Sequence, residues 1–180
     1  MNNQFSRINN TKRVGIGISF ILFPLIFIFA FAGHPNLFNP HFLGPAELIQ
    51  RAHNDSLLHF GHALVTLCTG LLVVVAIHFM NVLKNTKQEW YGFIGSAIAI
   101  LGALFLAADK GALCLTMSAL DTVPENEFVK MMPGLLAMFN KEGWLILIWG
   151  LVLLPIGFAI QTIGLLKSRS LATWQSILFL

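Results

Sequence analysis

The sequence predicts an all-α integral membrane protein, a helical bundle with four transmembrane helices. Hydrophobic residues make up 56% of the 180 residues and charged residues only 11%, whereas an ordinary soluble domain carries about 25% charge. The apolar residues gather in runs of about 20, the length that crosses a bilayer. This composition excludes a water-soluble enzyme and a disordered tail. The net charge of +3 comes without a Lys/Arg cluster, so no nucleic-acid partner is expected.

The first two spans are predicted at about 14–33 and 57–80. A basic pair precedes the first span, as it would in a secretory signal. The apolar run is too long for a signal, however, and it ends in a bulky His-Pro sequence instead of a small-residue cleavage site. We therefore expect a true span. Asp55 or Ser56 is placed to cap the N-terminus of the second span.

The third and fourth spans are predicted at about 91–120 and 144–166. The third stays apolar for most of its length and acquires charged residues only towards its end. Pro24 and Pro155 lie inside the first and fourth spans. Neighbouring helices can satisfy the carbonyls that a proline frees, so both runs are expected to continue as helices through their prolines.

Short interfacial helices are predicted in the external loops and at the C-terminus. A proline at the first helical position favours a helix over 45–52. Thr122 and Glu125 form a capping-box pattern that opens another helix, which Pro133 and the glycine after it are expected to break. The apolar segment 171–180 is too short to cross, so it either lies in the interface or begins a further span.

The positive charges predict the orientation of the bundle. One side carries Arg7, Lys12, Arg13, Lys84, Lys87, Lys167 and Arg169. The other side carries Arg51, Lys130 and Lys141. Because cytoplasmic loops are enriched in Lys and Arg, we expect a multi-pass protein of the cell inner (plasma) membrane with a cytoplasmic N-terminus. The loops after the first and third spans are then external.

Ionisable side chains within the spans mark the candidate site, because charge is costly there and defaults to function. His59 and His62 share one face near the external end of the second span, at about 100° per residue. The third span enters the membrane from the cytoplasmic side, so Asp109 and Lys110, near its external end, are expected at the same depth in the membrane as these two histidines. The predicted ligand-binding cluster is His34, His59, His62, Asp109, Lys110 and Glu142. A histidine of the second span is expected to pair with Asp109.

Two classes of function fit this cluster. The first is a non-catalytic protein that holds a lipid- or quinone-like ligand, or a partner membrane protein, at the external pocket. A partner helix could approach the small-residue face Gly95, Ala99, Gly102 and Ala103. The alternative is a haem- or metal-binding redox membrane subunit that uses His59 and His62. No histidine in the third or fourth span opposes them, and a bundle haem needs ligands from facing helices. Enzymatic activity stays open.

The order of several motifs resembles a known group of proteins. The first span ends in His34-Pro35, the second begins with His59-Phe-Gly-His62, the third ends in Asp109-Lys110-Gly111, and Lys167-Ser-Arg-Ser-Leu-Ala-Thr-Trp174 follows the fourth. In this order the chain resembles small uncharacterised bacterial multi-span membrane proteins of the DUF4386-like kind. The resemblance covers most of the chain. It implies a multi-span helical architecture and no particular activity.

Overall fold

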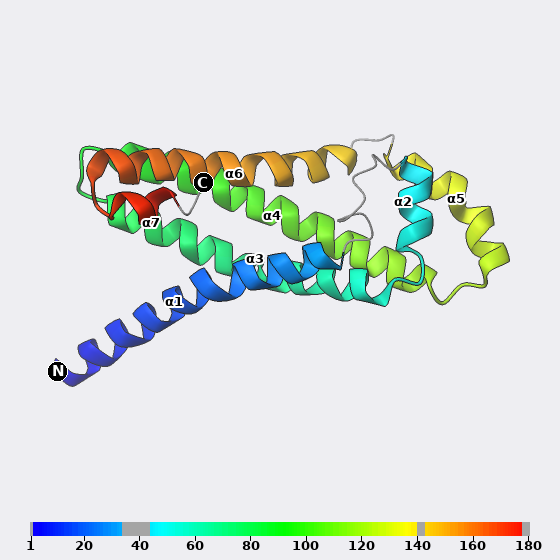
Figure 1. Ribbon diagram of the computed structural model, residues 1–180, viewed down its shortest axis with the longest axis horizontal. Coiled ribbons are helices and arrows are strands. Elements are labelled where there is room, and N and C mark those ends of the chain that lie inside the picture. Colours follow the sequence, from blue (N-terminus) through cyan, green and yellow to red (C-terminus); the bar gives the residue numbers. More distant parts are fainter. Residues whose placement is uncertain (1, 34–43, 140–142, 178–180) are drawn as a thin grey trace.

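The computed structural model describes residues 2–33, 44–139 and 143–177, and all secondary structure in these ranges is helical. Figure 1 shows an elongated helical bundle with two short helices across one end. The predicted all-α fold class is confirmed. The helices are α1 (Asn2–Ala32), α2 (Pro45–Ala52), α3 (Ser56–Leu83), α4 (Glu89–Leu120), α5 (Glu125–Phe139), α6 (Gly143–Ser168) and α7 (Thr173–Ile177).

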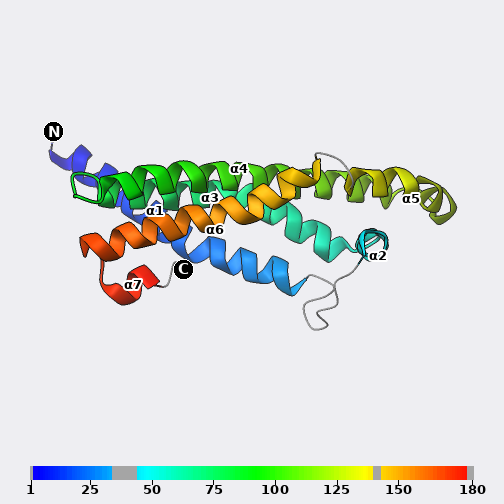
Figure 2. The same cartoon turned by 90° about the horizontal axis from the view of Figure 1, so that it is seen from above.

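Four of these helices, α1, α3, α4 and α6, are long and apolar enough to cross a membrane. Helix α4 packs against both α3 and α6, and α1 packs on α3. Towards its N-terminus α1 diverges from the other helices (Figure 1), and it crosses α3 and α4 at an angle (Figure 2). The observed bounds agree with the predicted spans within a few residues, except that α1 begins well upstream. The apolar helices are compatible with a multi-pass membrane protein in contact with lipid.

Local signals in the sequence account for the ends of α3 and α1. Asp55 caps α3, because its carboxylate accepts a hydrogen bond from the Leu58 N–H at 3.0 Å. The polar segment before the first apolar run has no proline or glycine, since the first glycine of the chain is Gly15. No helix-breaking residue therefore prevents α1 from starting upstream of the apolar run. Pro24 and Pro155 both lie inside helices, as expected.

Small residues bring α4 and α6 into close backbone contact. Gly102 approaches Leu154 so closely that a Cβ atom there would lie 2.8 Å from the Leu154 Cα. Gly150 and Gly157 make similar approaches from the α6 side, towards Leu106 and Ala99. Close packing through glycine is a common route to helix association in membranes. We call this contact the α4–α6 seam.

The seam corrects one expectation about partners. The face of Gly95, Ala99, Gly102 and Ala103 was expected to be open to another membrane protein. All four residues are buried, and the first three lie against α6 of the same chain. The physical reason is that the glycines of α6 complement this face. The small-residue face therefore holds the bundle together and is closed to a partner helix.

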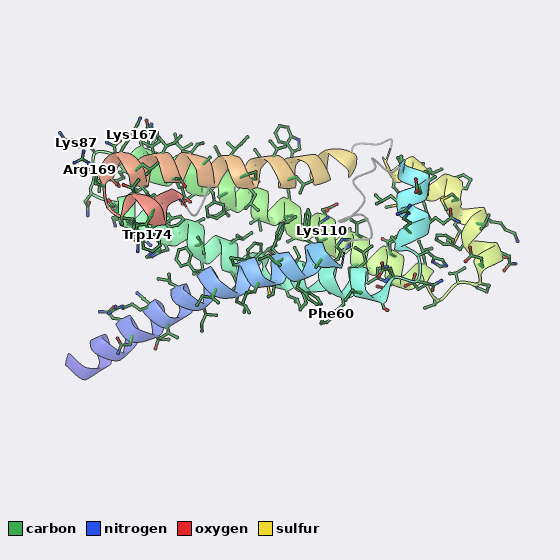
Figure 3. All side chains as sticks on the ribbon, in the orientation of Figure 1. Phe60, Lys87, Lys110, Lys167, Arg169 and Trp174 are labelled. Carbon is green, nitrogen blue, oxygen red and sulfur yellow. The ribbon has the colours of Figure 1, made fainter. Side chains whose placement is uncertain are left out.

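The two ends of the bundle differ in their charge and in the short helices that cover them. At one end, Lys87, Lys167 and Arg169 gather beside the short helix α7, near Trp174 (Figure 3). We call it the basic end. At the other end, which we call the cap end, α2 and α5 lie across the bundle (Figure 1).

Helices α2 and α5 share an apolar contact with the end of α4. Ile49, Met117, Leu120, Phe128 and Leu135 form this buried cluster. The cluster explains why α5 is not broken at Pro133, contrary to expectation. Leu135 anchors the turn beyond the proline, and Val129, whose carbonyl would lose its helical hydrogen bond, is 57% exposed.

Candidate functional site

The structure divides the predicted cluster into two groups. His34 and Glu142 lie outside the described residues. Asp109 and Lys110 remain together on α4, towards the cap end, where Figure 3 shows Lys110. His59, near the start of α3, belongs instead to a second group of residues at the α2–α3 and α4–α5 corners.

Asp109 forms an ion pair with its neighbour Lys110. The Asp109 Oδ2 and Lys110 Nζ atoms are 3.0 Å apart, and the side chains are 11% and 19% exposed. Asp109 therefore pairs with its neighbour on α4, and His59, one of the histidines of α3 that were expected to pair with it, contacts Asp121 instead. Adjacent helical side chains diverge by about 100°, but the flexible four-carbon stem of lysine lets its ammonium return to the carboxylate. We refer to these two residues as the Asp109–Lys110 pair.

The Asp109–Lys110 pair retains unused hydrogen-bonding capacity. Asp109 Oδ2 is buried and accepts no hydrogen bond from any described residue, although Lys110 lies within ion-pair distance. A buried polar atom without a hydrogen bond is uncommon and calls for a physical explanation such as a water or another bound group. An ammonium group has three N–H donors. The pair can therefore bind a ligand that accepts a hydrogen bond from Lys110 and donates one to Asp109.

The surroundings of the pair come from α3. Gly111, which follows Lys110, faces Thr66, since a Cβ atom on Gly111 would lie 3.4 Å from the Thr66 Cγ2. The Thr66 hydroxyl donates to the His62 carbonyl at 2.9 Å. The pair thus lies close to the level of Thr66, about one helical turn along α3 from the predicted residue His62.

His59 is held by two acceptors. Its Nε2 lies 2.9 Å from the Ala52 carbonyl oxygen, and its Nδ1 lies 3.0 Å from Asp121 Oδ2. The His59 side chain is 8% exposed. To ligate a metal, His59 would have to give up one of these contacts. In the part of the chain that the structure describes, no group of three or more His, Cys, Asp or Glu side chains could hold a metal ion.

His53 reaches the same aspartate from the end of α2. Its Nδ1 lies 3.3 Å from Asp121 Oδ1, out of line for a hydrogen bond, and its Nε2 lies 3.3 Å from Glu125 Oε2. The ring stacks on Phe128 with centroids 3.8 Å apart and an interplanar angle of 7°. We call His53, His59, Asp121 and Glu125 the cap network.

Sequence reasoning missed the cap network. Asp121 also accepts a hydrogen bond of 2.8 Å from the backbone N–H of Asn54, whose φ of 60° turns the chain between α2 and α3. The signal was present in the sequence, because His53 just precedes the predicted start of the second span and Asp121 just follows the end of the third. Both positions fall on the same side of the bundle, but their pairing depends on how the two corners turn.

A second polar cluster lies inside the bundle. Gln161 of α6 is fully buried, and its Nε2 donates to the Ala76 carbonyl at 2.9 Å and to the Ser96 hydroxyl at 2.6 Å. The Ser96 hydroxyl donates to the same carbonyl at 2.7 Å. These bonds join α3, α4 and α6. Interhelical hydrogen bonds of this kind hold membrane helices together, so we interpret the cluster as structural.

An apolar recess of about 130 Å³ opens between α1, α3 and α6. Its lining residues are Ser19, Phe20, Phe23, Pro24, Leu72, Val75 and Phe158. The Ser19 hydroxyl donates to the Gly15 carbonyl at 2.9 Å. On α3 the recess begins about 9 Å further along than Thr66, at 1.5 Å per residue. It is a place for apolar groups and is separate from the Asp109–Lys110 pair.

Comparison with known proteins adds no functional assignment to this geometry. No family model, curated protein or solved structure matches the chain. The described side chains therefore identify the candidate site. Buried atoms without a hydrogen bond from the described residues also occur in the other two polar groups, at His53 Nδ1 of the cap network and at Gln161 Oε1 inside the bundle. The Asp109–Lys110 pair differs from them because it places two largely buried charges and an unused acceptor inside a candidate span, and so it is the candidate functional site.

Proposed function

We propose that the protein is a non-catalytic multi-pass membrane protein that binds an amphipathic, lipid- or quinone-like ligand with its polar head at the Asp109–Lys110 pair. The observation that carries this proposal is the buried Asp109 Oδ2, which lies 3.0 Å from Lys110 Nζ and accepts no hydrogen bond from the described residues. Ionisable residues within membrane spans are expensive and commonly mark a binding site or a transport pathway.

The depth of the pair supports a ligand with a polar head and an apolar tail. Asp109 lies 20 residues from Glu89, the first residue of α4, which corresponds to about 30 Å of helix. The hydrocarbon core of a bilayer has about the same thickness. If Glu89 lies at one boundary of the core, Asp109 lies near the other, where lipid headgroups and quinone heads reside. A quinol, or a lipid headgroup that carries a hydroxyl, can accept from Lys110 and donate to Asp109.

We further propose that the basic end faces the cytoplasm of the cell inner membrane and that the N-terminus is cytoplasmic. By the order of the spans in the sequence, seven Lys and Arg residues fall on the side of the basic end and the N-terminus, against three on the side of the cap end, which supports this orientation by the positive-inside rule. Reporter fusions after residue 86 should give a cytoplasmic signal, and fusions after residues 40 and 130 an external signal. A cytoplasmic signal at residue 40 or 130 would contradict the orientation.

The binding proposal is tested by thermal unfolding of the purified protein with two added ligands. A short-chain ubiquinol and a short-chain phosphatidylglycerol represent the quinone and phospholipid classes. A ligand that binds only the folded state raises Tm as its concentration increases. At 100 times its Kd, the ligand adds about 2.7 kcal/mol to the free energy of unfolding. We expect one of the two ligands to raise the Tm of the wild type. The same ligand should raise the Tm of the Lys110→Met variant by a much smaller amount.

The matched control is Lys87→Met, an exposed lysine at the basic end. This variant should respond to the ligand as the wild type does. An equal Tm response in Lys110→Met and Lys87→Met would show that the Asp109–Lys110 pair does not hold the head, and no saturable response to either ligand in the wild type would contradict the binding proposal for both classes.

A further inference from the structure

The cap network contains only acceptors opposite its histidines. Nε2 of His59 faces a backbone carbonyl, and Nδ1 faces the Asp121 carboxylate. Both ring nitrogens of His53 face carboxylate oxygens, those of Asp121 and Glu125. A neutral imidazole has one N–H donor, and only imidazolium donates from both nitrogens. Both His59 contacts are therefore satisfied in the protonated form alone, and a protonated His53 ring places its positive charge opposite both carboxylates.

Other features of the cap end favour positive charge on these rings. Asp121 caps the C-terminus of α4, and the negative end of a helix dipole attracts cations. The stacked Phe128 ring presents its face to His53 at 3.8 Å, an arrangement that favours a cationic partner. The side chains of His53 and His59 are 6% and 8% exposed, so water cannot easily replace a lost partner.

The remaining charged groups of the surrounding helices are engaged elsewhere. On α2, Glu47 pairs with Arg51, and on α5, Glu127 pairs with Lys130. At the start of α3, the Asp55 carboxylate accepts from the Leu58 N–H. From α4, the Cys114 thiol donates to the His59 carbonyl at 3.5 Å and does not face the ring nitrogens. Asp121 and Glu125 are therefore the charges that respond to protonation of the two histidines.

The network joins segments that are far apart in the chain. His53 and His59 flank the corner between α2 and α3, whereas Asp121 and Glu125 flank the corner between α4 and α5. When the rings lose a proton, each leaves at least one nitrogen lone pair facing an oxygen lone pair, and the attraction between the corners weakens. Histidine changes its charge between about pH 5 and pH 8.

We propose that the cap network is a proton-controlled latch. Protonated His53 and His59 hold the α2–α3 corner against the α4–α5 corner, and loss of their protons as the pH rises weakens this contact. The apolar cluster that includes Ile49 and Phe128 still joins α2 to α5, so the change loosens the cap end of the bundle without separating its helices. This inference needs no ligand at the Asp109–Lys110 pair, so it can stand or fall independently of the proposed binding function.

The test is a distance measurement between spin labels on α2 and α5 at pH 5 and pH 8.5. Labels are attached at Gln50→Cys and Val129→Cys, both exposed positions, in a full-length chain in nanodiscs whose native Cys68 and Cys114 are replaced by serine. We expect a short, narrow distance distribution at pH 5 and a longer, broader one at pH 8.5. Identical distributions at the two pH values would overturn the proposal.

Three variants separate the latch from a general effect of pH. Asp121→Asn removes the shared carboxylate and should give the broad distribution at both pH values. His59→Gln replaces the imidazole by an amide that can donate a hydrogen bond but cannot be protonated, so its pH response should be reduced even if Asp121→Asn fails to fold. Glu127→Gln, outside the network, should respond as the wild type does. An unchanged pH response in folded His59→Gln and Asp121→Asn would overturn the latch.

Discussion

Replacing Gly157 by alanine should destabilise the bundle, although alanine is the better helix former. A Cβ atom on Gly157 would lie 2.6 Å from the Ala99 Cα and 2.7 Å from the Ala99 Cβ, so the α4–α6 seam must open. Overpacking of this kind costs about 1–3 kcal/mol, more than the roughly 1 kcal/mol that alanine gains over glycine in a helix interior. Unfolding in mixed detergent micelles, followed by circular dichroism, measures the difference.

The matched control for this prediction is Gly70→Ala. Gly70 also lies inside a candidate span, on α3, but nothing lies within 4 Å of the position that its Cβ would occupy. This variant should be as stable as the wild type or slightly more so. If Gly157→Ala and Gly70→Ala changed the unfolding free energy equally, the close approach of α4 and α6 would not be what holds these helices together.

Replacing Asp109 by asparagine should destabilise the protein by leaving the Lys110 charge without its counter-ion. Removing one partner of a buried ion pair costs about 3–5 kcal/mol, and an unpaired lysine at the centre of a membrane helix costs about 2.5–3.5 kcal/mol. Because Lys110 is 19% exposed and lies towards one end of α4, we expect a smaller loss, of about 2 kcal/mol on the same scale. The same micelle unfolding assay applies.

A double-mutant cycle shows whether the effect belongs to the ion pair. Asp109→Asn with Lys110→Met removes both charges, so the pair of changes should cost less than the sum of the single changes. The control cycle combines Asp109→Asn with Lys87→Met, which lies at the basic end, and should be additive. Additivity in both cycles would mean that Asp109 and Lys110 do not stabilise each other in the folded protein.

The spans could be predicted from the sequence because length and hydropathy alone limit a membrane helix. The runs at 57–80, 91–120 and 144–166 needed no tertiary information, and Asp55 marked the start of α3. The continuation of α5 past Pro133 could not be predicted in this way, since it depends on the apolar contact of Leu135 with α2 and the end of α4. The small-residue face of α4 was recognised, but only the fold shows that α6 occupies it.

The candidate site was predicted in part. Depth along each helix brought Asp109 and Lys110 to the level of His62, and the structure keeps these residues on adjoining helices. Depth could not predict rotamers, so the ion pair between neighbours on α4 was missed. Depth along the helix also could not predict how the α2–α3 corner turns. This turn brings the His59 ring into contact with the Asp121 carboxylate. Site residues that depend on corners and side-chain conformations require the three-dimensional structure.

The most direct test of the proposed function is to identify what the protein carries when it is purified. Lipids and quinones extracted from the wild type, from Lys87→Met and from the charge-free double variant Asp109→Asn/Lys110→Met are compared by mass spectrometry with those of the host membrane. We predict one amphipathic species enriched over its membrane abundance in the wild type and in Lys87→Met, and absent from the folded double variant. The same profile in all three proteins would contradict a ligand held at the Asp109–Lys110 pair.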